Sequence, residues 1–292
     1  MKVLLTGAAG QLGRELQRTA NSHCELAAFD HAGLDIANAD LVAQTAEEVA
    51  PDVVINAAAY TAVDRAEEDE ETALAVNAFG ARNIARAAAD QNARLIHIST
   101  DFVFSGESGR PYSPTSEPDP RSAYGASKLS GEQKVLETIS DSAVILRTAW
   151  VYSQFGHNFV KTMLRLMQKE SEIEVVCDQV GSPTWAHGLA QAVWTFTARP
   201  ELTGIFHWTD SGVASWYDFA VAIENEARVL GILGSDCTIK PIDSSRRPTA
   251  ARRPPFGVLD KTSTWEKLGL VSPHWRVQLR AMLRQSLEAS DE

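Results

Sequence analysis

Short apolar segments alternate with helical patterns throughout the first half of the chain. The sequence predicts strands at residues 3–5, 25–29, 53–55, 95–98 and 143–146. It predicts helices at 11–20, 39–50 and 124–139, and a long helical stretch at 64–92 that is interrupted near Phe79-Gly80. Strands that are apolar along their whole length are typical of a parallel sheet with helices on both faces. We therefore expect an α/β protein built on a Rossmann-type, doubly wound parallel sheet.

The second half of the chain is less regular. Helical patterns recur at 159–167 and 217–229, and a loop rich in proline and arginine runs from 246 to 255. We expect a dinucleotide-binding domain at 1–150 and, at 151–292, mainly a smaller substrate-binding lobe. This lobe would lie over the strand ends, where open α/β sheets bind ligands, and segments of it can return to the first domain.

A glycine-rich turn joins the first strand to the first helix. It reads Gly7-Ala8-Ala9-Gly10-Gln11-Leu12-Gly13, a G-x-x-G-x-x-G variant of the dinucleotide fingerprint. Glycines let the backbone approach phosphate closely, and a helix N-terminus favours negative charge. We expect this turn to bind the pyrophosphate of a dinucleotide, the alternative being a tight turn without a ligand.

An acidic residue, Asp30, ends the second predicted strand, 17 residues after Gly13. A carboxylate there can accept hydrogen bonds from the adenosine ribose and would repel a 2′-phosphate, which favours NADH. The alternative is a surface turn residue. The following Asp35-Ile36 could flank the adenine or form only a turn.

The chain carries a Y-x-x-x-K pattern at Tyr124 and Lys128, four residues apart and so on one helix face. A neighbouring ammonium is expected to lower the pKa of a phenol and allow Tyr124 to transfer a proton at neutral pH. Thr100, which follows the fourth strand, could hydrogen-bond a substrate carbonyl or the phenol, although such residues are often helix caps. Together with the glycine turn, these residues indicate nicotinamide-dependent carbonyl chemistry.

Composition and charge exclude several other classes. The chain has 292 residues and a net charge of −11, which argues against a general nucleic-acid binder. The three cysteines have no C-x-x-C spacing, and no apolar run approaches the ~20 residues of a membrane span. We expect a cytoplasmic protein with no membrane or nucleic-acid partner, either a monomer or a homodimer.

The motifs resemble those of the extended short-chain dehydrogenase/reductases and, among them, the dTDP-4-dehydrorhamnose reductase family. The matching segments span nearly the whole chain in order. They are the turn Gly10–Leu16, N-A-A-A-Y-T-A-V-D-R-A-E from Asn56, S-T-D-F-V-F from Ser99, Y-G-A-S-K-L-S-G-E from Tyr124, R-T-A-W-V-Y from Arg147, Asn158-Phe159, Asp178-Gln179 and Ala251–Pro254.

The resemblance implies reduction of the C4 ketone of dTDP-4-dehydro-L-rhamnose to dTDP-L-rhamnose with NADPH or NADH. Tyr124 would donate the proton, Lys128 would hold the nicotinamide ribose, and Thr100 would assist. The cofactor would also contact Gly10, Gln11, Leu12, Asp30, Asp35, Ile36, Ala59, Tyr60, Thr61 and Ile98. The sugar nucleotide would contact Thr100, Asp101, Trp150, Asn158 and Arg253, the last within an arginine loop that suits a diphosphate or is only solvated.

The chain departs from the family pattern at the metal site. Some family members hold Mg²⁺ between subunits with carboxylates of the first helix and of a later segment. Glu15 is present here, but Trp185-Ala186-His187-Gly188 has no carboxylate, and we expect no metal site.

The rival functions are an epimerase or dehydratase of the same fold and a non-catalytic regulatory subunit. For a dehydratase, Asp101 is a possible acid, but Phe102 follows it where a glutamate would be expected. The intact Thr100, Tyr124 and Lys128 argue against a non-catalytic subunit.

Overall fold

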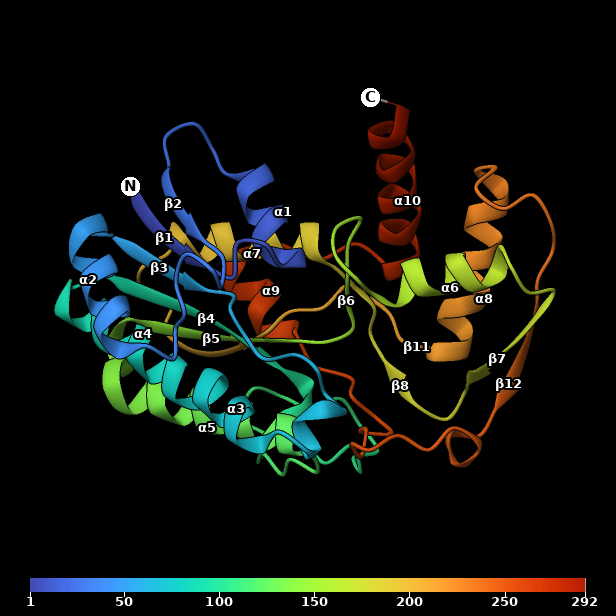
Figure 1. The fold of residues 1–292 in the computed structure, drawn as a ribbon, viewed down its shortest axis with the longest axis horizontal. Helices are drawn as coiled ribbons and strands as arrows, with labels where there is room; N and C mark the ends of the chain where they lie inside the picture. Colours follow the sequence, from blue (N-terminus) through green and yellow to red (C-terminus); the bar gives the residue numbers. More distant parts are fainter. Residues whose placement is uncertain (292) are drawn as a thin grey trace.

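A six-stranded parallel sheet in the order β10-β5-β4-β3-β1-β2 forms the centre of one lobe, and all of its strands except β10 come from the first half of the chain (Figure 1). The computed structural model describes residues 1–291 and, among these, the side chains of residues 1–288. The strands are β1 (Lys2–Thr6), β2 (Glu25–Phe29), β3 (Val53–Asn56), β4 (Arg94–Thr100), β5 (Ala143–Thr148) and β10 (Gly204–His207). The expected doubly wound α/β fold is confirmed.

Helices cover both faces of the sheet (Figure 1). One face packs against α1 (Gln11–Thr19), α7 (Ala186–Thr197) and α9 (Thr262–Leu268). The other packs against α2 (Ala39–Val49), α4 (Ala81–Asp90) and α5 (Ala123–Ile139). Because both faces are buried, β3 and β5 are buried along their whole length, which explains their continuous apolar sequence.

Residues 64–92, for which the sequence indicated a long helical stretch interrupted near Phe79-Gly80, are interrupted there and divided further in the structure. They form η1 (Arg65–Glu67), α3 (Glu70–Leu74), a π-helical turn η2 (Ala75–Gly80), and α4. Within η2, the Asn77 side chain accepts a 2.9 Å hydrogen bond from the Tyr60 backbone and donates one of 3.1 Å to the Tyr60 carbonyl. The wider turn therefore places Asn77 where it holds the end of the β3 connection.

A second apolar cluster lies in the other half of the molecule. It is built by α6 (Phe159–Met167), α8 (Trp216–Val229) and α10 (Trp275–Asp291), together with β7 (Glu172–Val176) and β12 (Thr238–Ile242), which pair in parallel. Short strands complete this half: β6 (Val151–Tyr152) pairs with β9 (Thr184–Trp185), and β8 (Val180–Gly181) with β11 (Ala214–Ser215).

The chain passes back and forth between the two halves. Strand β10 joins the parallel sheet beside β5, and α7 and α9 pack on that sheet, although all three follow residue 150. The predicted division into residues 1–150 and 151–292 therefore stays a proposal for the main bodies of two lobes. No helix among the described residues has both the length and the apolar character that crossing a bilayer requires.

Candidate active site

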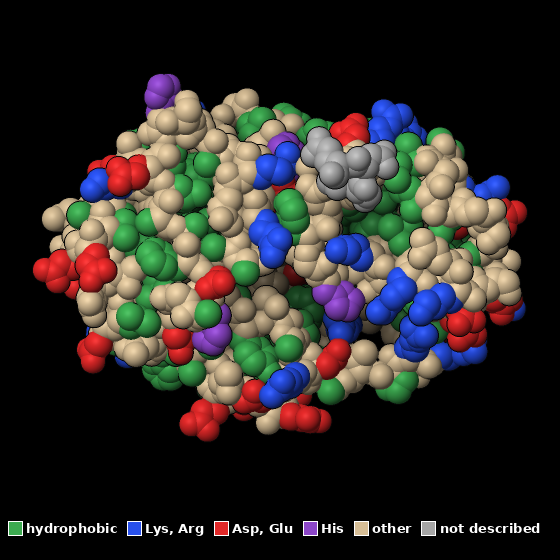
Figure 2. Space-filling view, turned by 45° about the horizontal axis from the view of Figure 1, so that its top comes forward, with side chains coloured by type: hydrophobic (Ala, Val, Ile, Leu, Met, Phe, Trp, Pro, Cys, Tyr) green, Lys and Arg blue, Asp and Glu red, His purple; other side chains and the backbone are tan. Residues whose placement is uncertain are grey.

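Two adjoining cavities run along the carboxyl ends of the sheet strands. The larger one, of about 730 Å³, extends from Asp30, Asp35 and Ile36 past the glycine turn to Tyr60 and Thr61. The smaller one, of about 350 Å³, contains the ends of β4 and β5 and the start of α5. They share a border of Gln11, Leu12, Ala57, Ala59, Thr61 and Val151. Figure 2 shows the molecule hollowed near its middle, with histidine and basic side chains at the rim.

The structure brings the predicted cofactor residues together along this groove. The larger cavity is lined by Gly7, Gly10, Gln11, Leu12, Gly13, Asp30, Asp35, Ile36, Ala59, Tyr60 and Thr61. The smaller one is lined by Ile98, Thr100, Asp101, Tyr124, Lys128 and Trp150.

The glycine turn is shaped by close backbone packing. Gly7 has φ +74°, and a side chain there would lie 2.6 Å from the backbone of Ala57. A Cβ at Gly13 would lie 2.2 Å from the Gly7 carbonyl oxygen. These two positions need glycine, and they set the first turn of α1, with its unpaired amides, against the cavity. A cavity of this size with a helix N-terminus at its wall and a carboxylate at its end fits a dinucleotide.

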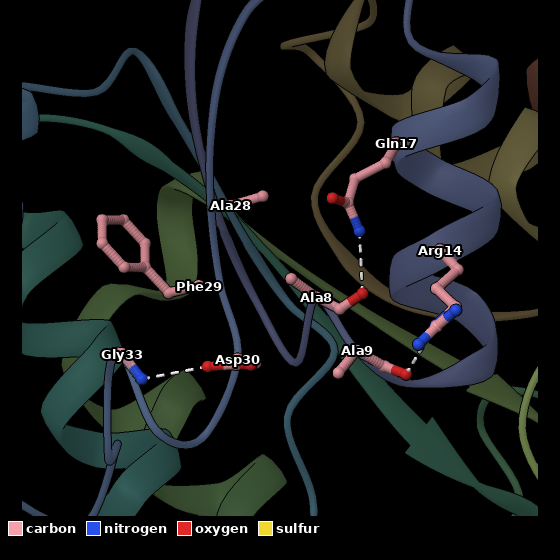
Figure 3. A pocket seen from close by; sticks show the side chains of 8 residues that line it. All are labelled: Ala8, Ala9, Arg14, Gln17, Ala28, Phe29, Asp30 and Gly33. Carbon is pink, nitrogen blue, oxygen red and sulfur yellow. Dashed lines mark hydrogen bonds between the residues drawn. The ribbon is translucent and has the colours of Figure 1, made fainter.

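A further cavity of about 440 Å³ lies on the other side of Asp30, between β2 and α1 (Figure 3). The Asp30 carboxylate accepts a 3.0 Å hydrogen bond from the Gly33 amide. Arg14 donates a 3.2 Å hydrogen bond to the Ala9 carbonyl, and Gln17 donates one of 2.8 Å to the Ala8 carbonyl (Figure 3). A carboxylate and a guanidinium thus line one cavity beside the adenosine end of the groove, which suits use of either NADH or NADPH.

Proton-bearing groups meet in the smaller cavity. Tyr124 and Lys128 lie one turn apart on α5 and are 8% and 2% exposed. The Thr100 hydroxyl at the end of β4 donates a 3.2 Å hydrogen bond to Asp101 and lines the same cavity as the Tyr124 phenol. The Lys128 ammonium donates a 2.8 Å hydrogen bond to the Ile98 carbonyl. A substrate carbonyl at this place would meet a phenol and a hydroxyl together.

The expected lowering of the Tyr124 pKa is wrong for this structure. Burial raises the pKa of Tyr124 to about 12, the nearby Thr100 hydroxyl opposes that rise, and the Asp101 carboxylate adds to it. Burial also lowers the pKa of Lys128 to about 8, against the influence of Glu132. The ammonium points to the Ile98 carbonyl, so desolvation outweighs its effect on the phenol. Tyr124 is therefore a protonated phenol at neutral pH, the form that a proton donor needs.

A buried ion pair fixes α5 against the sheet beneath these residues. The Glu132 carboxylate accepts hydrogen bonds from Arg147 at 2.9 and 2.6 Å and from the Ser99 hydroxyl at 2.5 Å. All three side chains are at most 3% exposed. The pair joins α5 to β4 and β5 two turns after Tyr124, and so sets the position of the helix relative to Thr100.

Comparison with known proteins now defines the family. The model of the RmlD substrate binding domain matches residues 1–288. The chain belongs to this family. It is 39% identical to the dTDP-4-dehydrorhamnose reductase of Escherichia coli strain K12, over 98% of each chain. It is also 39% identical to a dTDP-4-keto-6-deoxy-D-glucose reductase of Streptomyces niveus, over 94% of each. The solved structure of a Bacillus anthracis dTDP-4-dehydrorhamnose reductase in complex with NADP superposes with a TM-score of 0.91 at 37% identity, over 97% of this chain and 99% of that one.

The family resemblance that the motifs indicated is thereby confirmed, and with it an NAD(P)H-dependent oxidoreductase fold. The roles of single residues stay predictions, because the comparisons identify the family and not its site residues in this chain.

Three of the predicted substrate residues have other partners in the structure. Trp150, with φ +49°, stacks on Trp216 at 3.5 Å between ring centroids, so one of its faces is covered. Asn158 caps α6 and does not line the smaller cavity. Arg253 donates a 2.6 Å hydrogen bond to Asp64 and lies outside the cavity lining. Their contact with a sugar nucleotide remains a prediction, and this geometry does not favour it for Asn158.

Glu15, the carboxylate of the first helix that the family resemblance suggested as a magnesium ligand, already has protein partners. The buried carboxylate of Glu15 accepts hydrogen bonds from Arg18 at 3.0 and 2.8 Å and from Ser153 at 2.9 Å. His187 lies 3.7 Å from the same carboxylate and 2.7 Å from Arg18. In residues 1–288, no group of three or more acidic, histidine or cysteine side chains is arranged to hold a metal ion. This donor set does not fit Mg²⁺, which prefers several oxygen ligands.

Several residues of the groove had no signal in the sequence. His31 and Leu34 follow Asp30, Thr72 and Val76 come from the interrupted helix, and Gly156 and His157 come from the second half. Leu189, in α7, lines the smaller cavity. Only tertiary packing places these residues at the strand ends.

Proposed function

We propose that this chain uses NADPH or NADH to reduce the C4 ketone of dTDP-4-dehydro-L-rhamnose to dTDP-L-rhamnose. The observation that carries the proposal is the meeting of Thr100, Tyr124 and Lys128 in a cavity continuous with the groove at the glycine turn. The family and its dTDP-4-dehydrorhamnose reductases supply the substrate class.

The chain's own residues hold the reactants and supply a proton. When bound, the reduced nicotinamide supplies a hydride to the carbonyl carbon. Tyr124, protonated at neutral pH, donates its proton to the carbonyl oxygen, where negative charge develops. The Thr100 hydroxyl gives a second hydrogen bond to that oxygen. Lys128, one turn after Tyr124 on α5, holds the nicotinamide ribose.

The first turn of α1, Asp30 and Arg14 are the groups that would bind the phosphates and the adenosine ribose of the cofactor. The amides of the first turn of α1 bind the pyrophosphate, and Asp30 accepts hydrogen bonds from the adenosine ribose. Arg14 lines the cavity on the far side of Asp30 and can pair with a 2′-phosphate. A cytoplasmic location belongs to the same proposal and is supported by the three unpaired cysteines. The proposal also includes a monomeric or homodimeric state.

The test is oxidation of NADPH and NADH by the purified chain with each of several dTDP-4-ketosugars, followed by identification of the product. We expect turnover with dTDP-4-dehydro-L-rhamnose and a product that matches dTDP-L-rhamnose. Because the Streptomyces relative is a dTDP-4-keto-6-deoxy-D-glucose reductase by name, that sugar is the second substrate to try. A strong preference for that sugar would replace the proposed substrate, and no cofactor oxidation with any ketosugar would refute the reductase.

A further inference from the structure

The second half of the chain supplies one wall of the groove proposed for the dinucleotide. Gly156 and His157 line the larger cavity together with the glycine turn. They belong to residues 153–158, which we call the bridging segment and which connects β6 to α6 (Figure 1). This wall faces the helix N-terminus, where a pyrophosphate would lie.

Direct contacts fasten the bridging segment to the first helix. The Asn158 amide donates a 2.9 Å hydrogen bond to the Gln11 side chain in the first turn of α1. One turn later, Ser153 donates a 2.9 Å hydrogen bond to the buried carboxylate of Glu15. Both Ser153 and Asn158 are buried, at 0% and 8% exposure. The segment is thus held at both of its ends, and the residues between them have a fixed position over the glycine turn.

Between these anchors the chain passes close to the first helix. Gly156 has φ +65°, and a side chain there would lie 3.2 Å from the Cγ atom of Gln11. His157 follows at the exposed rim of the cavity. Its Nδ1 atom lies 3.5 Å from the Thr162 hydroxyl, and in the described part of the chain its Nε2 atom has no hydrogen-bond partner. The Nδ1 contact with Thr162 therefore orients the imidazole ring, and the Nε2 atom is available to bind a ligand.

We propose that His157 is a cofactor-binding residue that donates a hydrogen bond to the pyrophosphate, from the wall opposite the amides of α1. The inference rests on the proposed dinucleotide-dependent function. A pyrophosphate carries negative charge on both of its phosphates, and the helix amides reach it from one side only. Of the two residues that the bridging segment contributes to this cavity, only His157 carries a side-chain N–H group.

The experiment measures binding of ligands that differ in their phosphates. NADPH, NADH, ADP-ribose and adenosine are titrated against the full-length wild type, His157→Ala and His157→Gln, with adenosine measured by competition. The matched control is His23→Ala, at an exposed residue that does not line the cavity, and it should bind all four ligands like the wild type. The thermal midpoint of each variant shows whether it is folded.

We expect His157→Ala to weaken the three diphosphate ligands by a common factor of roughly 2 to 13, the range for one hydrogen bond. Adenosine should bind unchanged, and His157→Gln, which keeps an N–H donor, should recover most of the loss. Wild-type affinity of His157→Ala for all three diphosphates, or an equal loss for adenosine, would overturn the inference while the wild type still binds NADPH. If the wild type binds no dinucleotide, the proposed function itself fails.

Discussion

The Asp101 carboxyl gives a pH-dependent prediction that follows directly from its surroundings. The side chain is 3% exposed, and the Cα of Gly257 packs so closely that a Cβ there would lie 2.4 Å from the carboxylate. Burial raises the pKa of Asp101 to about 7, although hydrogen bonds from the Thr100 hydroxyl and from the Phe102 backbone oppose the rise. The Asp101→Asn variant replaces the carboxyl with a neutral group of nearly the same shape.

The sign of the effect follows from the two states. In the unfolded chain the pKa is near 3.8, and in the folded chain it is about 7. The folded state therefore holds the proton more tightly, and the carboxyl lowers the free energy of unfolding as pH rises from about 4 to about 7. The pKa difference of about three units, at ~1.4 kcal/mol per unit, lowers the free energy of unfolding by roughly 4 kcal/mol. This full loss is reached once the carboxyl is ionised in the folded state. Asparagine cannot ionise and avoids this loss.

The assay is denaturant unfolding of the wild type and Asp101→Asn at several pH values between 4.5 and 8. We expect the difference in unfolding free energy, variant minus wild type, to increase with pH and to level off above pH ~7. Asp90→Asn, at an exposed position, serves as the control for loss of a surface carboxylate and should show a constant difference. Parallel curves for the wild type and Asp101→Asn would show that burial does not perturb this carboxyl.

Three further predictions concern ligands. Asp30→Ala should lower the KM for NADPH relative to that for NADH, because a carboxylate that repels the 2′-phosphate is gone, and an unchanged ratio of the two KM values would refute this. Exhaustive chelation should leave activity and any dimer intact, since Arg18 and Ser153 already satisfy Glu15, and a chelator effect reversed by Mg²⁺ would contradict it. Arg253→Ala should raise the KM for the sugar nucleotide by about 10-fold or more with the cofactor KM unchanged. A lower thermal midpoint with unchanged KM values would instead assign Arg253 to its 2.6 Å ion pair with Asp64.

The parts of the fold set by short-range pattern could be predicted from the sequence. The apolar strands and the glycine turn are local features, and the spacing of Tyr124 and Lys128 places them on one helix face wherever that helix lies. Parallel strands end at one edge of their sheet, so residues at the strand ends, such as Thr100 and Asp30, line the adjoining cavities along that edge.

Features that depend on distant packing could not be predicted in this way. The return of β10 to the sheet follows from contacts between residues far apart in sequence. The same holds for the place of His157 at the groove and for the stacking of Trp150 on Trp216. The pKa of Tyr124 was expected to fall because a cation was expected near it. Burial, which the pattern does not reveal, reverses the direction.

The central claim is that Tyr124 supplies the proton during carbonyl reduction, and the rate of NADPH oxidation by Tyr124→Phe with dTDP-4-dehydro-L-rhamnose tests it most directly. The phenylalanine keeps the ring that packs edge-on against Phe102 at 5.5 Å and removes only the hydroxyl. We predict that turnover falls roughly 10²-fold or more while the Kd for NADPH stays near the wild-type value. Tyr217→Phe, which changes a phenol on α8 that lines neither cavity, should keep nearly full turnover. Wild-type turnover by Tyr124→Phe, under conditions where chemistry limits the rate, would contradict the account.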